Sequence, residues 1–329
     1  MNQFVLGIDI SKDTFDVALF KAERYQHRVF ANTPPGFKRL HRWLRSQGVE
    51  YVHAGLEATN RYWEDLAEHL YKQGHAVSVI NPVRIKRYGE SKLHRNKTDK
   101  ADATLIAEFC WKEKPRLWEP LPLHVKQLRQ MVRRLDNLQT MQQQERNRLQ
   151  PGITSAWVVA DLEDHLSDLQ QRIKSLKAVI QQHITATPEL KRNVDLLVSI
   201  PGIGLLTAAR LLGEIGDITR FDNPGQLTAF AGLNPKGHLS GSSVYKKTRI
   251  SKEGRPFLRR SLYMPALVAR KHNPIVRSFC DRLAESKLHP MAVVVAAMGK
   301  LLHLTYGILK NQIPFDPNYA KSLPLTLDI

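Results

Sequence analysis

The sequence predicts a mixed α/β domain followed by mainly helical parts, and three observations indicate this. Apolar, β-branched runs alternate with helix-like spacing over roughly the first 80 residues. A long polar stretch with heptad-like apolar spacing comes next, and beyond Pro188 the chain becomes globular again. The 329 residues are more than one hydrophobic core comfortably serves, so we expect two or three domains.

The N-terminal part predicts a sheet whose strands first follow one another and then alternate with helices. The expected strands are residues 4–10, 15–20, 25–31, 51–57 and 76–80, and the expected helices are residues 37–46 and 61–73. Three consecutive strands followed by helix–strand alternation predict a mixed sheet with helices packed against it.

Long helices are predicted beyond the sheet. Residues 99–113 form one helix, and residues 125–150 and 162–184 form two more, separated by Pro151 and Gly152. One stripe of the first long helix is apolar: Leu128, Met131, Leu135, Leu138 and Met141. This pattern favours an antiparallel hairpin that joins two domains, and it is compatible with pairing to another subunit. The expected domains are residues 1–118 (sheet), 119–187 (coiled-coil arm) and 188–329 (mainly helical).

The net charge points to a polyanionic partner. The chain has 49 basic and 31 acidic residues, a formal charge of +18, which repels itself unless a polyanion neutralises it. Nucleic acid is the leading candidate. An anionic membrane surface is second, but the sequence shows no amphipathic terminal helix or lipidation motif that would support it.

Other features favour a cytoplasmic protein with no membrane partner. Cys110 and Cys280 lie far apart in apolar surroundings, which excludes a zinc cluster and indicates buried thiols. The N-terminus lacks the pattern of a signal peptide. The apolar run from Met291 to Met298 stops near Lys300, far short of a membrane span.

Four carboxylates are the candidate metal ligands. Asp9 lies inside a predicted strand, where an uncompensated acid is costly, and Glu57 ends another strand. Asp99 and Asp102 are three residues apart at the start of a helix and therefore share a face. If the four converge, they repel unless a hard cation such as Mg²⁺ binds between them. A pair of such ions is a common arrangement for phosphodiester chemistry.

Each acid also has a structural interpretation. Asp99 could cap its helix together with Thr98, and Asp102 could be a solvated residue on the helix face. We interpret the nearby Asp13 as a turn residue and Asp16 as an exposed position on the second strand.

A turn between two helices is a candidate DNA contact. The segment from Ser199 to Gly216 is predicted as helix, Pro-Gly-Ile-Gly turn and helix, and Gly202 and Gly204 allow a close approach of backbone. A helix-hairpin-helix of this kind grips the DNA backbone without reading its sequence. The alternative is an ordinary turn between helices.

A Gly/Ser-rich basic loop is the second candidate for chemistry. Ser240, Ser242 and Ser243 surround Gly241, and cations that suit phosphate follow: Lys246, Lys247, Arg249, Lys252, Arg255, Arg259 and Arg260. A serine here could attack phosphorus and hold a broken strand as a phosphoserine. The alternative is a loop that only binds phosphate. We interpret His238 as a loop residue without a catalytic role.

These motifs together resemble one protein family. GIDISKDTFDVAL, LEATNRYW, INPVRIKRYGESKLHRNKTDKADA and SGSSV resemble the one-ten family of bacterial insertion sequences, the bridge-RNA-guided transposases, to which the pilin-gene invertases are related. The resemblance covers roughly residues 4–318. One departure is Asn60, where related sequences often carry glycine, but asparagine tolerates positive φ.

The resemblance implies an RNase H-like, RuvC-like domain with Asp9, Glu57, Asp99 and Asp102 as metal ligands, and Ser240 as nucleophile in the C-terminal domain. It further implies a DNA transposase or site-specific recombinase that uses Mg²⁺, forms a covalent phosphoserine and is guided by a non-coding RNA pairing with donor and target DNA. Because the acids and the serine fall on separate domains, a composite site in a dimer or tetramer is expected.

Three alternatives remain at this point. The first is a RuvC-like junction endonuclease that hydrolyses DNA with metal and water. The second is a DNA invertase that reads its sites through protein alone. The third is a nucleic-acid-binding protein whose acids are structural.

Overall fold

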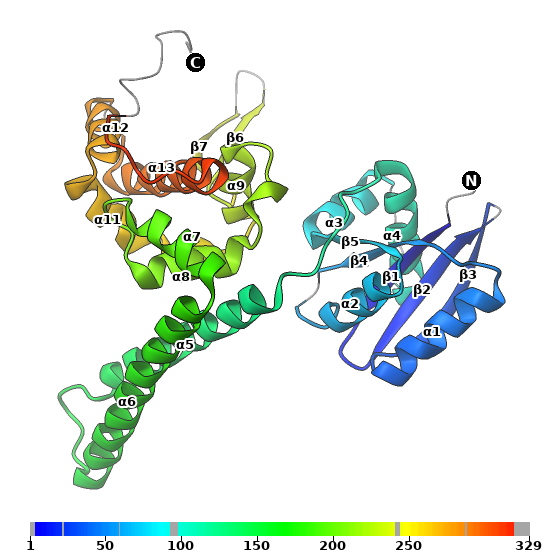
Figure 1. Ribbon diagram of the computed structural model, residues 1–329, viewed down its shortest axis with the longest axis horizontal. Coiled ribbons are helices and arrows are strands. Elements are labelled where there is room, and N and C mark those ends of the chain that lie inside the picture. Colours follow the sequence, from blue (N-terminus) through cyan, green and yellow to red (C-terminus); the bar gives the residue numbers. More distant parts are fainter. Residues whose placement is uncertain are drawn as a thin grey trace. The chain divides into compact units, whose positions relative to one another are not determined.

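The chain folds into two compact units, residues 1–120 and 121–329 (Figure 1). The structure is a computed structural model that describes residues 4–21, 23–58, 60–92, 98–240, 244–286 and 288–318, with backbone alone at residues 237–240 and 244–248.

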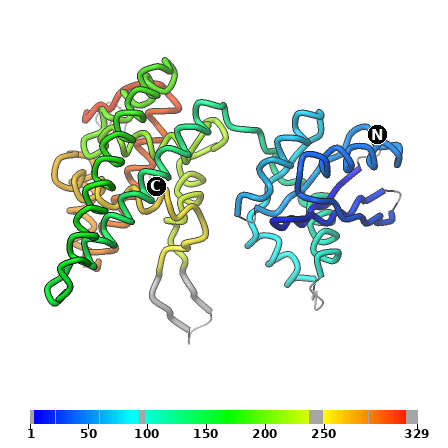
Figure 2. Tube along the Cα trace, turned by 90° about the horizontal axis from the view of Figure 1, so that it is seen from below, coloured from blue at the N-terminus to red at the C-terminus, as the bar shows by residue number. Residues whose placement is uncertain are grey.

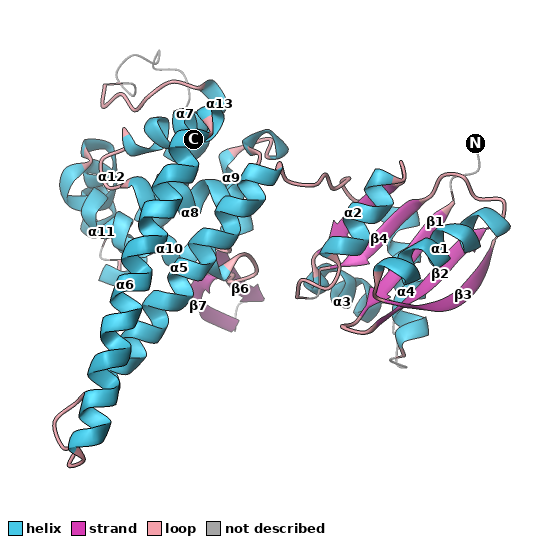
Figure 3. Ribbon diagram, turned by 60° about the horizontal axis from the view of Figure 1, so that its bottom comes forward, coloured by secondary structure: helices cyan, strands magenta, loops and turns pink. Residues whose placement is uncertain are grey.

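The first unit is a five-stranded mixed sheet with the strand order β3-β2-β1-β4-β5. Its strands are β1 (Val5–Ile10), β2 (Thr14–Lys21), β3 (Arg24–Ala31), β4 (His53–Glu57) and β5 (Ala76–Ile80). β1, β2 and β3 pair antiparallel, whereas β4 is parallel to both β1 and β5. Every strand predicted for this part is present, so the mixed sheet is confirmed (Figure 3).

Helices cover both faces of this sheet. They are α1 (Pro34–Ser46), α2 (Glu64–Lys72), α3 (Pro82–Ser91) and α4 (Asp99–Glu113). Side chains alternate along a strand, so Leu6 and Ile8 of β1 join the core formed with α1 and α2, and Val5 joins the core formed with α3 and α4. Asp9, two residues beyond Gly7, therefore belongs to the α4 face.

Two neighbouring glycines let α4 lie close to the sheet. Gly7 of β1 pairs with Gly55 of β4. A Cβ on Gly7 would collide with the Ala103 carbonyl and would come within 2.8 Å of the Ala107 Cβ, and a Cβ on Gly55 would collide with the Cys110 sulfur. Because side chains are absent at these two points, the helix backbone approaches the strands directly.

The helix α3 and a small sheet after residue 234 differ from the sequence expectations. No helix was predicted for residues 82–91, but the structure has one. Pro82 occupies its first helical position, and the side chain of Asn81 caps it by accepting a hydrogen bond from the Val83 amide. The basic loop contains an antiparallel pair, β6 (Pro235–Ser240) and β7 (Val244–Ile250). Its glycine and serine content favoured a loop, whereas tertiary context selects strands on either side of residues 241–243.

The second unit is mainly helical. Its helices are α5 (Leu123–Arg148), α6 (Ala156–Ala186), α7 (Pro188–Val198), α8 (Leu205–Ile215), η1 (Ile218–Arg220), α9 (Pro224–Ala231), α10 (Pro256–Ser261), α11 (Tyr263–His272), α12 (Pro274–Glu285) and α13 (Pro290–Asn311). The helices α5 and α6 run side by side as an antiparallel hairpin (Figure 2). Leu128 and Val132 of α5 belong to the same hydrophobic core as Leu211 of α8, so the hairpin base and the later helices share one core.

The helix α13 contains the apolar run from Met291 to Met298 and continues beyond Lys300. It has 22 residues, and an 18-residue window within it has a mean hydropathy of 1.6, so its length and composition would suffice to cross a membrane. However, Val293, Ala297 and Leu301 are buried in the core of the second unit, and half of the apolar window is buried. This position is that of a core helix, and no membrane protein is indicated.

The glycine contact beneath α4 generates a stability prediction. We expect Gly7→Ala to lower the free energy of unfolding of the first unit by about 3 kcal/mol, because the added Cβ meets helix backbone that cannot move aside. Chemical denaturation of the full chain measures this. The control is Gly307→Ala in α13, where a Cβ would meet nothing within 4 Å, and it should be neutral or stabilising by up to about 1 kcal/mol. Equal effects of the two substitutions would contradict the packing role of Gly7.

Candidate active site

Asp9 and Glu57 are neighbours at one end of the sheet. β1 and β4 are paired in parallel as far as Ile8 and Leu56, and the two carboxylates are the next residue of each strand. They share a face with Gly7 and Gly55, two residues earlier, so both belong to the face that α4 covers. Both residues are half-buried. The convergence predicted for these two acids is therefore present in the backbone register.

The first turn of α4 supplies the other two acids. Thr98 caps the helix, because its side chain accepts a hydrogen bond from the Ala101 amide at 3.2 Å, so Asp99 is the first helical residue and not the cap. Ala103 lies over Gly7, which places the preceding Asp102 toward the end of β1. The positive end of the helix dipole favours acids in this turn.

The electrostatics of Asp9 show that these carboxylates lie near one another. Burial, followed in order of influence by the charges of Asp102, Asp99 and Glu57, raises the pKa of Asp9 from 3.8 to about 6. Such a shift means that the protein disfavours the charged form of Asp9. A half-buried carboxylate among like charges would be stabilised by a bound cation.

Asp16 is a fifth carboxylate that sequence reasoning placed wrongly. It is half-buried and lies directly across from Asp9 in the β1–β2 register. Burial and the charge of Asp99 raise its pKa. The interpretation as an exposed position overlooked the tight turn at residues 11–13. Because β1 and β2 are antiparallel on either side of this turn, Ile10 pairs with Phe15 and Asp9 pairs with Asp16. Like charges that face each other across strands are destabilising.

The donor set fits a hard divalent cation. All five acids offer carboxylate oxygens, the ligands that such ions prefer, and a cation would relieve the repulsion that raises the pKa of Asp9. Within the part of the chain that the structure describes, no three His, Cys, Asp or Glu side chains are grouped so that they could hold a metal ion. The acids thus interact through space without forming a closed ligand cluster.

Asn60, the departure noted in the LEATNRYW motif, follows the end of β4. Its φ is +52°, within the left-handed region that glycine favours and asparagine tolerates. The substitution is therefore accommodated by the backbone, as expected.

Ser240 is the last residue of β6, where it pairs with Val244 of β7. The side chains of Ser240, His238, Lys246 and Lys247 lie outside the described part of the chain, as do Ser242 and Ser243. The backbone therefore places Ser240 at the end of a two-stranded hairpin.

The remaining predicted phosphate contacts divide into two groups. Arg249 and Lys252 are exposed, as a contact to DNA requires. Arg255, Arg259 and Arg260 have protein partners: Arg255 reaches Glu214 at 3.4 Å, Arg259 donates to the Ala231 carbonyl at 2.9 Å, and Arg260 reaches Asp136 at 3.4 Å. Arg260 remains 67% exposed, so its ion pair leaves much of the guanidinium open to solvent.

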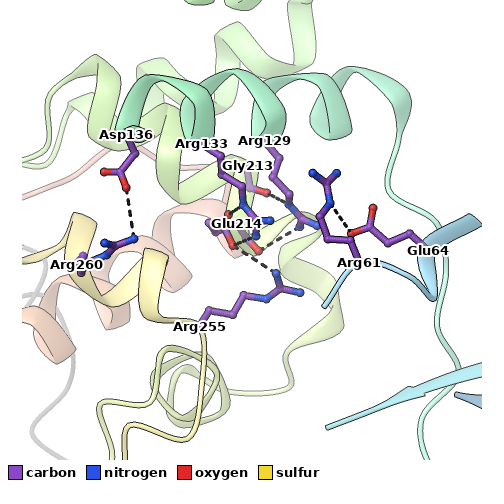
Figure 4. Close-up of polar contacts among 9 residues, drawn as sticks. All are labelled: Arg61, Glu64, Arg129, Arg133, Asp136, Gly213, Glu214, Arg255 and Arg260. Carbon is purple, nitrogen blue, oxygen red and sulfur yellow. Dashed lines mark hydrogen bonds and ion pairs between the residues drawn. The ribbon is translucent and has the colours of Figure 1, made fainter. Parts of the chain in front are cut away.

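Glu214 organises the arginines at the junction of α5, α8 and α10 (Figure 4). Its side chain is fully buried. Arg133 donates to both carboxylate oxygens, at 2.7 and 3.0 Å. Although burial opposes the charged form, the hydrogen bonds and charge of Arg133 and the charges of Arg255 and Arg129 hold the pKa of Glu214 below its usual value. One buried anion thus positions several cations.

The two glycines of the predicted helix-hairpin-helix differ in their surroundings. Gly202 has a φ of +108°, and a Cβ there would lie 2.8 Å from the Ala269 Cβ of α11, so it serves the turn and its packing. Gly204 is exposed, begins α8 without a side-chain cap and has open space around its Cα. The backbone at Gly204 is the part of this turn that a ligand could approach.

Comparisons with known proteins identify the family. Residues 6–157 match the DEDD transposase family of the IS110 type, described as "Transposase", and residues 194–281 match the "Transposase IS116/IS110/IS902 family". The pilin gene-inverting protein of Moraxella bovis is 34% identical over 96% of this chain and 98% of its own. The chain belongs to the IS116/IS110/IS902 transposase family. It is a DNA transposase or recombinase.

The pilin gene-inverting protein of Moraxella lacunata has the same identity and coverage, 34% over 96% of this chain and 98% of its own. The transposase for the insertion sequence element IS1111A of Coxiella burnetii is 26% identical over 82% of this chain and 78% of its own. Among solved structures, RuvC of Thermus thermophilus in complex with a Holliday junction substrate covers 36% of the chain with 13% identity and a TM-score of 0.27. For this transposase, the DEDD domain indicates dependence on a divalent metal.

The buried ion cluster generates a prediction for the second unit of the transposase. Glu214→Gln should lower its free energy of unfolding by about 3–5 kcal/mol, because Arg133 and Arg255 lose the buried counter-charge that they share. Urea denaturation measures the loss. Asp195→Asn is the control, since Asp195 forms an exposed i,i+4 pair with Lys191 and should change stability by less than about 1 kcal/mol. A Glu214→Gln protein as stable as this control would refute the organising role of Glu214.

Proposed function

We propose that this transposase cuts and rejoins DNA with Mg²⁺ bound by Asp9, Glu57, Asp99 and Asp102, and with Ser240 as nucleophile. The observation that carries the proposal is that Asp9 and Glu57 end adjacent parallel strands on the face covered by α4, whose first turn carries Asp99 and Asp102. In agreement with this, burial and the charges of these acids raise the pKa of Asp9. Acids that are distant in the sequence repel one another here, which is expected of a site whose repulsion a bound cation would relieve.

Each group of residues has a distinct part in the reaction. Bound Mg²⁺ would stabilise negative charge on the scissile phosphate. The four carboxylates would hold the cation at the strand ends. The Ser240 oxygen attacks phosphorus and forms a 5′-phosphoserine bond, while the phosphorus–oxygen bond to the neighbouring nucleotide breaks and leaves a 3′-hydroxyl. Attack by a 3′-hydroxyl on the phosphoserine rejoins DNA and releases the serine without an external energy source.

Substrate binding is assigned to the exposed basic residues and to the turn at Gly204. Arg249 and Lys252 suit phosphate, and the α8 amides at Gly204 suit the backbone of DNA in a helix-hairpin-helix contact. A non-coding RNA that pairs with donor and target DNA would supply specificity. The basic charge of +18 is compatible with both nucleic acids.

Assembly follows from the position of the two sets of residues. The acids belong to residues 1–118, Ser240 belongs to residues 188–329, and the arm at 119–187 lies between them in sequence. A dimer or tetramer could combine the acids of one subunit with the serine of another. The arm would then act as a coiled coil between subunits as well as within one.

A second candidate function is site-specific inversion read by protein alone. It is favoured by the similarity to the Moraxella bovis pilin gene-inverting protein, 98% of whose length aligns with this chain at 34% identity. Inversion and transposition require the same cutting and joining chemistry. They differ in whether an RNA is bound, so nuclease treatment of the purified protein–nucleic acid complex distinguishes them.

The serine mechanism predicts a covalent protein–DNA adduct. With a junction substrate and Mg²⁺, wild-type protein should form an adduct that survives denaturation on a gel, and Ser240→Ala should reduce its yield by at least about 100-fold, as loss of a nucleophile does. Ser242→Ala is the control and should retain the adduct. Cutting by Ser240→Ala without an adduct would favour hydrolysis by metal-activated water instead.

The proposed metal site predicts that removing the Asp9 charge stabilises the metal-free protein but weakens its binding of Mg²⁺. Because the folded-state pKa of Asp9 is raised to about 6, the ionised form at neutral pH destabilises the fold, and this penalty disappears as the pH falls below 4. Asp9→Asn should therefore stabilise the metal-free protein by about 1–2 kcal/mol and abolish its stabilisation by Mg²⁺.

Thermal unfolding with and without Mg²⁺ at neutral pH checks this. Glu50→Gln, at an exposed position outside the carboxylates, is the control and should leave both measurements unchanged. If Asp9→Asn keeps the full stabilisation by Mg²⁺, Asp9 is not a ligand.

A further inference from the structure

A basic cavity lies at the edge of the sheet, apart from the carboxylates. It has a volume of about 540 Å³ and is lined by Arg28, Val29, Phe30, Ala31, Arg39, Arg42, Trp43 and Ser46. Its walls are the end of β3 and one side of α1. We call it the arginine cavity, after Arg28, Arg39 and Arg42. No acidic side chain is among its lining residues.

The charges of the three arginines have no carboxylate partner among the described residues. Across the described ranges of the chain, no carboxylate forms an ion pair with Arg28, Arg39 or Arg42. All three are exposed at the rim, whereas Phe30 and Trp43 are buried beneath them. The Arg28 guanidinium lies 5.8 Å from the centre of the Phe30 ring, which restricts its orientation. Guanidinium groups so placed match phosphate oxygens in pairs.

The strand register relates this cavity to the carboxylates. Asp9 faces Asp16 across β1 and β2, and Asp16 faces Val29 across β2 and β3. With neighbouring strands roughly 5 Å apart, Val29 lies on the order of 10 Å from Asp9.

The two sites use opposite faces of the same sheet end. Arg28 and Phe30 alternate with Val29 and therefore belong to the α1 face, while Asp9 belongs to the α4 face. Because β3 is the edge strand of the sheet, a nucleic-acid strand can pass from one face to the other around this edge without crossing another element of the sheet. The arginine cavity cannot hold the scissile phosphate, but it can hold a neighbouring one.

We propose that the arginine cavity binds the phosphodiester backbone of the DNA strand flanking the cleavage position. The inference deepens the proposed function, because it names a second contact of the same substrate. It assigns Arg28, Arg39 and Arg42 to binding and not to chemistry. The contact would fix the register of the strand over the carboxylates, which phosphate contacts do in DNA-binding proteins generally.

The test measures how DNA affinity depends on salt. A fluorescein-labelled, mixed-sequence duplex is titrated with full-length protein in chelator, without divalent metal, over a range of chloride concentrations. Arg39→Gln/Arg42→Gln should lower the slope of log affinity against log salt by about 1.8, since each lost phosphate contact contributes about 0.9. Circular dichroism should confirm an unchanged fold, because both residues are exposed.

The matched control is Lys38→Gln/Arg45→Gln. It removes the same charge from exposed positions of the same helix but outside the cavity lining, and it should leave the slope close to that of wild type. Equal slopes for the two double variants would overturn the proposal, because the effect would then be one of net charge.

Two further outcomes separate related possibilities. If replacing chloride by inorganic phosphate at equal ionic strength removes the difference between wild type and Arg39→Gln/Arg42→Gln, the cavity holds a small anion and the strand assignment is wrong. The same difference measured in the Ser240→Ala background should persist. No cutting occurs in chelator, so the difference in salt slope between wild type and Arg39→Gln/Arg42→Gln does not depend on the serine or metal chemistry. Absence of that difference would therefore contradict the cavity proposal and not the proposed reaction.

Discussion

The close approach of α4 to the sheet is the contact on which the candidate active site depends. Gly7 and Gly55 face each other on adjacent strands, and any side chain at either position would displace the helix. That approach brings the first turn of α4 to the ends of β1 and β4. Acids from three elements therefore lie at one end of the sheet because two positions carry no side chain.

The two units treat buried acids in opposite ways. In the second unit, Glu214 is surrounded by arginines that lower its pKa, so the charge is satisfied and the helices are held together. In the first unit, burial and the charges of nearby acids raise the pKa of Asp9, so the charged form is disfavoured. Stability explains the first arrangement, since a paired buried charge locks its neighbours in place. The second arrangement costs stability in the protein without a bound cation, and a perturbed acid of this kind is typical of functional sites.

Much of the fold could be predicted because its signals are local. The strands of the mixed sheet follow from runs of β-branched residues, and the long helices follow from apolar spacing. The helix α3 was missed because its start depends on Asn81 and Pro82 and not on an apolar stripe. The β6–β7 pair was missed because a basic, glycine-rich segment has little strand propensity, and pairing there depends on context.

The candidate site could be predicted in part, for the same reason. Asp9 was recognised because an acid is costly within a strand, and Asp99 and Asp102 because their spacing puts them on one helix face. Asp16 was misplaced, although its partner across the hairpin could be counted from the turn. The partners of Arg255 and Arg259 lie far away in sequence, so their structural contacts could not be foreseen.

The sequence by itself determined the kinds of groups available: hard oxygen ligands, an excess of cations, a serine among small residues, and glycines where backbones can approach. The tertiary structure alone decided which groups face one another. It placed Asp16 opposite Asp9, enclosed Glu214 among arginines and left Arg28, Arg39 and Arg42 without carboxylate partners in the described part of the chain. The physical reason is that charge interactions depend on distance and burial, and for residues far apart in sequence both are set by packing.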